Sequence, residues 1–143
     1  MMTFADDLKK AQAAKTPYQD VPVVLGGKLH TLRFKQMNGL AWAAETDKYP
    51  PRLETTIDTT YGYNIRDLTR GTAPMSGFRL EGEQEMPLAE HEWDALFEAI
   101  TGHDFQKITD AIWALNEYDP QAAVAKAMEA QKKALARSSK GSV

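Results

Sequence analysis

The chain has 143 residues, no cysteine and a formal net charge of −3. Its hydrophobic (43%) and charged (26%) fractions are those of a folded domain and exclude a wholly disordered chain. Without cysteine there is no disulfide or thiolate metal site, and the weak negative charge gives no electrostatic reason to expect nucleic acid or membrane as partner. No apolar run reaches the length of about 18 residues that a membrane span needs, and the N-terminus has no secretory signal. We therefore expect a soluble cytoplasmic protein.

The domain organisation follows from length and composition. A chain of this size folds most often as one domain, which we place at residues 1–137, with a disordered tail at 138–143. The fold class that the patterns predict is mainly α with a small N-terminal β-hairpin, or α+β. In chain order we expect an N-terminal arm at 1–19, a β-hairpin at 20–36, a helical core at 37–120 and a C-terminal helix at 121–137.

The first half of the chain alternates between strand and helix signals. In the arm, Thr3 can cap a short helix. From Val21 to Phe34, apolar residues alternate with polar ones on either side of Gly26-Gly27, which predicts a hairpin with a glycine turn. Two strands are marginal alone, so residues 78–80 are the candidate third strand.

Further helices are marked by their caps and breakers. Asn38 caps the next helix, which Pro50-Pro51 ends. The segment 52–60 can be a short helix or extended, and Asn64 can cap another short helix as far as Leu68. The glycine- and proline-rich segment 71–86 is predicted to be a surface loop around the single strand.

The hydrophobic centre is predicted at 88–118, as an αα-hairpin. Trp93 and Leu96 begin a stripe with helical spacing, and Gly102 stands where a left-handed glycine would end that helix. Asp104 offers a cap to a second helix, and Pro120 is expected to close it. So short a connection predicts antiparallel packing of the two helices.

The segment after Pro120 has high helix propensity but a narrow apolar stripe. Val124, Met128 and Leu135 form the stripe, surrounded by alanines, and the last turn is basic. A helix of this kind often docks on its own body or on a partner.

The sequence offers little catalytic chemistry. Its histidines lack metal-ligand spacing, its serines lack a nucleophile-elbow pattern, and Gly26-Gly27-Lys28 lacks the spacing of a phosphate loop. Glu81, Glu83 and Glu85 would share one face of a strand, either to hold a hard cation or, more commonly, as a solvated edge. The helix after Gly102 is too acidic to read DNA. We therefore expect no enzyme activity, no catalytic residue, no metal and no cofactor.

A surface for protein partners remains as the functional candidate. Tryptophan, tyrosine and arginine are enriched at interfaces, although most of the aromatic residues of a chain this size belong to the core. The candidate partner-binding residues are Trp42, Tyr49, Arg52, Tyr63, Asn64, Trp113, Val124 and Met128.

An ordered set of motifs resembles a known family. The set comprises Trp42, Pro50-Pro51-Arg52, Gly62-Tyr63-Asn64, Glu92-Trp93 and Leu115-Asn116. Over roughly residues 20–120 the chain resembles the tail assembly chaperones of long-tailed bacteriophages, particularly those of actinobacteria. It departs from the expected pattern at Ala89, which stands where Ser or Thr would cap the Trp93 helix.

The resemblance implies a non-enzymatic, mainly helical assembly factor. Such a protein would bind the tape measure protein, help to recruit the tail tube protein, associate with itself, and be absent from the finished virion. It would act in the cytoplasm of the bacterial host, and a longer frameshifted form would be common. The alternatives are a structural virion component, such as a head–tail connector, and a small DNA-binding regulator.

Overall fold

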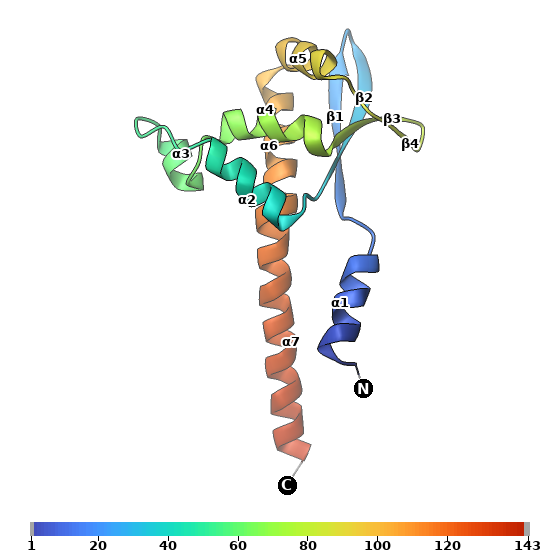
Figure 1. The fold of residues 1–143 in the computed structure, drawn as a ribbon, viewed down its shortest axis with the longest axis vertical. Coiled ribbons are helices and arrows are strands. Elements are labelled where there is room, and N and C mark those ends of the chain that lie inside the picture. Colours follow the sequence, from blue (N-terminus) through green and yellow to red (C-terminus); the bar gives the residue numbers. More distant parts are fainter. Residues whose placement is uncertain (1, 142–143) are drawn as a thin grey trace.

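The structure, a computed structural model, describes residues 2–141 and combines a small antiparallel sheet with a helical body (Figure 1). The mainly α class with a small sheet is confirmed, and the sheet has four strands in the order β1-β2-β3-β4. The strands are β1 (Tyr18–Leu25), β2 (Lys28–Lys35), β3 (Gly77–Glu81) and β4 (Gln84–Met86). The helices are α1 (Phe4–Ala13), α2 (Gly39–Lys48), α3 (Thr56–Tyr61), α4 (Ile65–Ser76), α5 (Glu90–Ala99), α6 (Gly102–Trp113), η1 (Ala114–Tyr118) and α7 (Asp119–Gly141).

The predicted hairpin is present as β1 and β2. The strands pair from Tyr18 opposite Lys35 to Leu25 opposite Lys28. Gly26 and Gly27 both have positive φ, at 57° and 77°, as a two-residue turn of the primed type requires. One face of the hairpin is buried against α6 and the other helices, through Val21, Val23, Leu32 and Phe34.

The segment 71–86 is not a surface loop, so that prediction is wrong. α4 continues through Gly71 and Pro74 to Ser76, and β3 and β4 form a second hairpin around Gly82. The strand predicted at 78–80 is confirmed within β3. The helix persists because its inward face, which includes Leu68, Thr72 and Ala73, is buried. Tertiary burial outweighs the low helix propensity of glycine and proline here.

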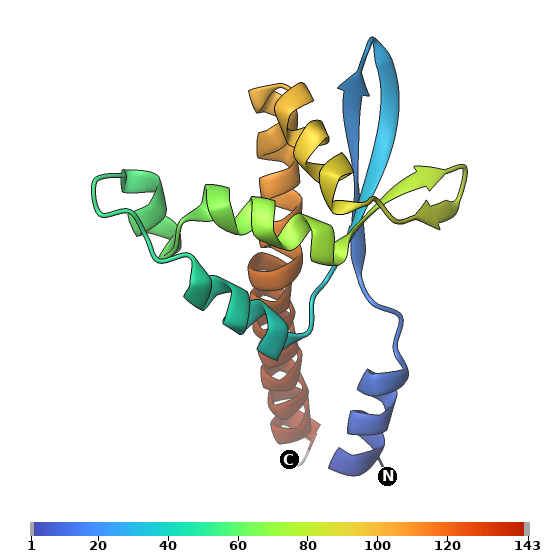
Figure 2. The same ribbon diagram turned by 45° about the horizontal axis from the view of Figure 1, so that its top comes forward.

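The two helices predicted at 88–118 are present as α5 and α6, but their arrangement differs from the expectation. Thr101, not Asp104, caps α6, and Gly102 is its first residue without a positive φ. α5 crosses the end of α6 instead of running antiparallel beside it (Figures 1 and 2). It packs on α4, and its Phe97 ring touches Phe105 of α6 at 5.7 Å between centroids.

The core lies where α4, α5 and α6 meet the inner face of the hairpin. Its largest fully buried side chains include Trp93, Phe34, Leu68, Ile108 and Leu115. α4 and α6 are also joined by a buried hydrogen bond of 3.1 Å between the hydroxyls of Thr69 and Thr109. The Thr69 hydroxyl donates its proton to the Ile65 carbonyl at 2.7 Å, so it is Thr109 that donates to Thr69, and a shift of the helices would leave the buried Thr109 hydroxyl unpaired.

Pro120 does not close the second helix, so that expectation is also wrong. α6 passes through the π-helical turn η1 into α7, and the three form one continuous rod (Figure 1). The Asp119 N–H donates to the carbonyl of Ala114, five residues back, as in a π-turn. The wider turn accommodates a proline, which has no N–H and whose ring would clash with the carbonyl four residues back in an α-helix.

The tail expected at 138–143 is helical as far as Gly141. The rest of that expectation concerns residues 142–143, which lie outside the described part of the chain. The helix continues because the sequence Ser138-Ser139-Lys140 holds no proline or glycine that would end it before Gly141.

Candidate partner-binding surface

A row of exposed apolar side chains lies on α7, which projects from the rest of the structure (Figure 1). Every residue from 121 to 139 is exposed. Val124, Met128 and Leu135 retain 60%, 65% and 67% of their accessible surface, and their spacing places them on one face. We call these three residues the α7 stripe. Alanines beside the stripe leave room for another helix to approach closely, since they carry no bulk beyond Cβ.

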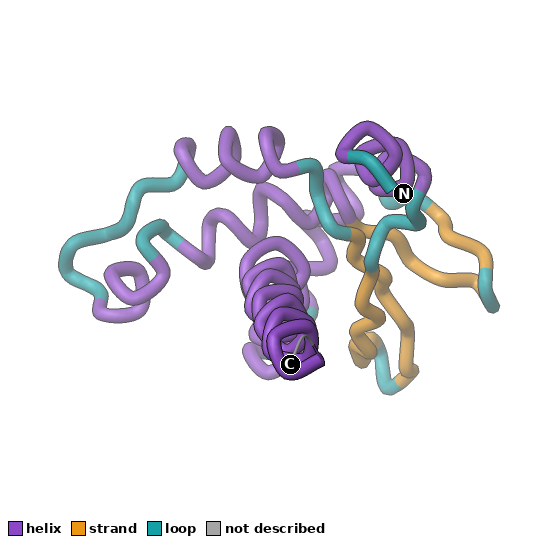
Figure 3. Tube along the Cα trace, turned by 90° about the horizontal axis from the view of Figure 1, so that it is seen from below, coloured by secondary structure: helices purple, strands orange, loops and turns teal. Residues whose placement is uncertain are grey.

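A second exposed apolar face lies on α1. Thr3 caps this helix, as predicted: its hydroxyl accepts from the Asp6 N–H, and the Asp6 carboxylate accepts from the Thr3 N–H. None of the residues of α1 is buried. Phe4 keeps 83% of its surface and Leu8 49%, and the two lie one turn apart on the same side. Seen from below, α1 lies apart from the end of α7 (Figure 3).

The base of α7 is fastened to the body by side chains on the loop after β2. The Gln36 amide donates to the carbonyl of Leu115 at 2.8 Å, and the Met37 N–H donates to the Asn116 side chain at 2.9 Å. Asn116 in turn donates to the carbonyl of Ile112 at 2.9 Å. The Leu115 carbonyl is free for this bond because the Asp119 N–H donates to Ala114 and Pro120 has no N–H. These contacts hold the start of α7 in a defined direction.

An aromatic cluster supports the same base. Tyr61 packs edge-on to Trp113 at 5.6 Å and stacks with Tyr63 at 6.2 Å. Trp42 meets Tyr63 edge-on at 6.3 Å and donates its indole N–H to Glu117 at 2.5 Å. Burial, and the nearby Glu117 carboxylate, raise the pKa of the Tyr63 phenol, which therefore stays neutral.

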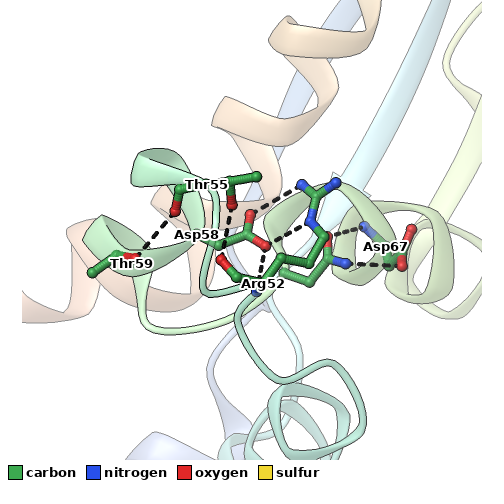
Figure 4. A network of polar contacts seen from close by, with 6 residues as sticks. Arg52, Thr55, Asp58, Thr59 and Asp67 are labelled. Atoms are coloured by element: carbon green, nitrogen blue, oxygen red, sulfur yellow. Dashed lines mark hydrogen bonds and ion pairs between the residues drawn. The ribbon is translucent and has the colours of Figure 1, made fainter.

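Arg52 is occupied by an ion pair inside the body (Figure 4). Its guanidinium donates to both oxygens of Asp58, at 2.8 and 3.2 Å, and its backbone N–H adds a third bond at 2.8 Å. Asp58 has no accessible surface. These bonds lower the pKa of the Asp58 carboxyl to about 2. Asn64 caps α4 by accepting from the Asp67 N–H at 3.2 Å, and its amide donates to the Asp67 carboxylate at 2.9 Å.

The structure thus separates the predicted surface residues into two groups. Six belong to the body: Trp42, Tyr63 and Asn64 are buried, Tyr49 and Trp113 are partly buried, and Arg52 is held by Asp58. Tyr49 packs against Gly71, where a side chain would collide with its hydroxyl. Only Val124 and Met128 are open to a partner. Leu135 on α7 and Phe4 and Leu8 on α1 are exposed apolar residues that the prediction left out. The helical spacing of apolar residues in the two segments could have identified them.

The remaining candidates for chemistry are dispersed. His30, His91 and His103 are exposed on separate elements. Among residues 2–141, no group of three or more His, Asp or Glu side chains is placed to hold a metal ion. The three glutamates do not share a strand: Glu81 ends β3, Glu83 is in the turn, and Glu85 in β4 pairs with Lys35 at 2.8 Å and with Arg33 at 3.4 Å.

Comparison with known proteins identifies no relative. No protein-family model, curated protein or solved structure matches the chain. Within the described residues, no helix combines the length and the apolar character that crossing a membrane requires.

Proposed function

We propose that this protein is a non-enzymatic tail assembly chaperone of a long-tailed bacteriophage, and that α7 is the surface that binds the tape measure protein. The observation that carries the proposal is the exposed α7 stripe on a helix fastened firmly at its base. A single apolar stripe on a projecting helix suits another amphipathic helix, which pairs with it along the i, i+4, i+7 positions.

The chemistry of the stripe suits a chaperone better than a permanent assembly. Three large apolar side chains among alanines offer little area for one binding event, so each contact is weak and reversible. A tape measure protein is long and helical, and many copies of the chaperone can cover it. Each copy bound beside another gains from multivalency, and self-association would strengthen this effect. Recruitment of the tail tube protein would then follow on a coated tape measure protein.

Co-expression with the tape measure protein of the same phage tests the proposal. The measured quantity is the soluble fraction of the tape measure protein, with and without this chain. The informative variant is Met128→Glu with Leu135→Glu, which places two charges in the α7 stripe. Its matched control is Ala122→Glu with Ala130→Glu, which adds the same charge on the opposite, equally exposed face.

We expect the wild-type chain and the control variant to keep the tape measure protein soluble, and the stripe variant to lose this effect. Equal activity of the two variants would exclude the α7 stripe as the binding surface. If the wild-type chain left the solubility of the tape measure protein unchanged, the chaperone function itself would be rejected.

A further inference from the structure

The linker between α1 and β1 ends, at Pro17, beside the turn from which α7 starts. The Gln36 N–H donates to the carbonyl of Pro17 at 2.9 Å, and the side chain of the same glutamine donates to the carbonyl of Leu115. One residue therefore links the end of the α1 linker to the turn from which α7 starts. α1 and α7 leave the body on the same side with opposite chain directions (Figures 1 and 2).

The lengths of the two segments agree. The extended linker from Pro17 to Ala14 spans about 10 Å, and a helix rises about 1.5 Å per residue. Leu8, six residues before Ala14, then lies about 19 Å from Pro17. Measured along α7 from Leu115, the same distance of about 19 Å is reached about 13 residues further on. The residue at that position is Met128, the centre of the α7 stripe.

The same distances along the two helices also match the other apolar residues of α1 with those of the α7 stripe. Ala11 reaches the level of Val124, and Phe4 falls between Met128 and Leu135. All of these side chains are exposed in the structure, so both faces are open to each other. A segment tied to the base of α7 has a high effective concentration there, which favours it over a second molecule.

We propose that α1 folds against α7 of its own chain as an antiparallel strap that covers the α7 stripe. In the arrangement of Figure 1 the strap is open; when it closes, Leu8 packs on Met128. The consequence of this closure rests on the proposed function: a helix of the tape measure protein must displace α1 before it can bind the α7 stripe. The strap thereby keeps the stripe covered until a partner with a longer apolar face arrives.

The natural absence of cysteine allows a direct test in the full-length chain. Leu8→Cys combined with Met128→Cys places two thiols at the predicted contact. Leu8→Cys combined with Lys126→Cys is the matched control, because Lys126 lies on the opposite face of α7. Each purified double variant is oxidised mildly at low protein concentration and run on a non-reducing gel, with intramolecular closure mapped by peptide mass spectrometry.

We expect the variant with Leu8→Cys and Met128→Cys to form its disulfide within one chain at least tenfold faster than the control variant. Equal rates for the two variants, or no closure, would overturn the strap. Disulfide-linked dimers as the main product would also overturn it, since α1 would then bind a second copy.

The regulatory consequence has its own readout, the affinity for the tape measure protein. Leu8→Glu should open the strap and tighten binding severalfold, because less of the protein is held in a closed state. Ala13→Glu, the control at the far end of α1, should bind as the wild-type chain does. Unchanged affinity of Leu8→Glu would overturn the regulatory role. If the cysteine pair closes but the wild-type chain never binds the tape measure protein, the strap stands and only the proposed function fails.

Discussion

Asp58 and Arg52 form an ion pair in which the guanidinium reaches both carboxylate oxygens. Asp58 is fully buried in the short helix α3, and Arg52 supplies three of the hydrogen bonds that compensate its charge. The pair ties the chain that follows Pro50-Pro51 to α3, at the foot of the aromatic cluster. A buried carboxylate that loses its partner is destabilising, so this contact should be visible in the pH dependence of stability.

The first prediction concerns acid unfolding. The pKa of Asp58 is about 2 in the fold, below the value of about 3.9 in an unfolded chain. A lowered pKa contributes stability that is fully present above the unfolded value and is lost as pH falls through the folded value. Arg52→Ala removes the main cause of the shift, so the variant should be less stable than the wild-type chain at neutral pH but should lose less stability between about pH 4 and pH 2, and the difference between the two chains should shrink as pH falls. Urea midpoints between pH 2 and pH 7 measure this.

The control for that experiment is Arg79→Ala, which removes an ion pair with Glu81 on the exposed second hairpin. Exposed pairs contribute little, so its pH profile should follow that of the wild-type chain. Identical profiles for Arg52→Ala and Arg79→Ala would contradict the role given to Asp58.

Close packing at Gly77 gives a second prediction. A Cβ at this position would lie 2.6 Å from the Trp93 ring, 2.7 Å from the Ala73 carbonyl and 2.8 Å from the Phe34 ring. Gly77→Ala should therefore destabilise the protein by about 1–3 kcal/mol, the usual effect of overpacking. Gly39→Ala is the control, because a Cβ there meets nothing within 4 Å. Thermal unfolding followed by tryptophan fluorescence compares the two, and equal Tm values would refute the tight fit.

Among the elements, β1 is an edge strand whose outer side is closed in two ways. Pro22 has no N–H to offer, and the Val24 N–H donates to the Asp104 carboxylate of α6 at 3.1 Å. Both residues lie at positions that point away from β2, since the pairs that flank a two-residue turn alternate in this way. The strand therefore presents few free groups to a neighbouring chain.

The third prediction follows from that contact. Asp104→Ala leaves the Val24 N–H without its acceptor in a partly buried contact, which should cost about 1–3 kcal/mol. Asp110→Ala, on the exposed side of the same helix, should cost less than about 0.5 kcal/mol. Chemical denaturation of both variants measures the difference. A similar loss in each would show that Asp104 has no special role at the strand edge.

The elements also show how far the sequence alone leads. Strand alternation and glycine turns located the first hairpin, and the caps at Thr3, Asn38 and Asn64 were correct. The errors arose at residues that break helices in isolation. Pro74 was placed in a surface loop and Pro120 was interpreted as a helix end, but burial of α4 and the π-turn before α7 keep both helices continuous. No local pattern encodes such tertiary compensation.

The candidate surface was predictable only in part for the same reason. Interface propensity selected aromatic residues, and the structure places Trp42 and Tyr63 in the support beneath α7. Periodicity selected Val124 and Met128, which are exposed. Composition cannot distinguish a buried tryptophan that supports a surface from an exposed one that forms it. A narrow apolar stripe on an alanine-rich helix, by contrast, indicates that the helix does not pack into the core of its own domain.

At the scale of the whole molecule, the exposed residues 121–139 of α7 add nothing to the buried core. The fourth prediction is that Met128→Glu with Leu135→Glu lowers the free energy of unfolding by no more than about 1 kcal/mol, because both side chains are exposed in the structure and the variant loses only the contact with α1. Ile108→Ala in the core should cost about 2–5 kcal/mol. Equilibrium urea unfolding of the two variants tests this. A large loss in the stripe variant would mean that the stripe belongs to the fold rather than to a partner.

The central claim is that α7 is the surface on which the tape measure protein is held. Hydrogen–deuterium exchange of this chain, alone and in complex with the tape measure protein, tests it most directly. We predict that the amides of residues 121–139 exchange more slowly in the complex, while those of the buried body change little. Protection confined to another face of the body, with unchanged exchange along α7, would contradict the account.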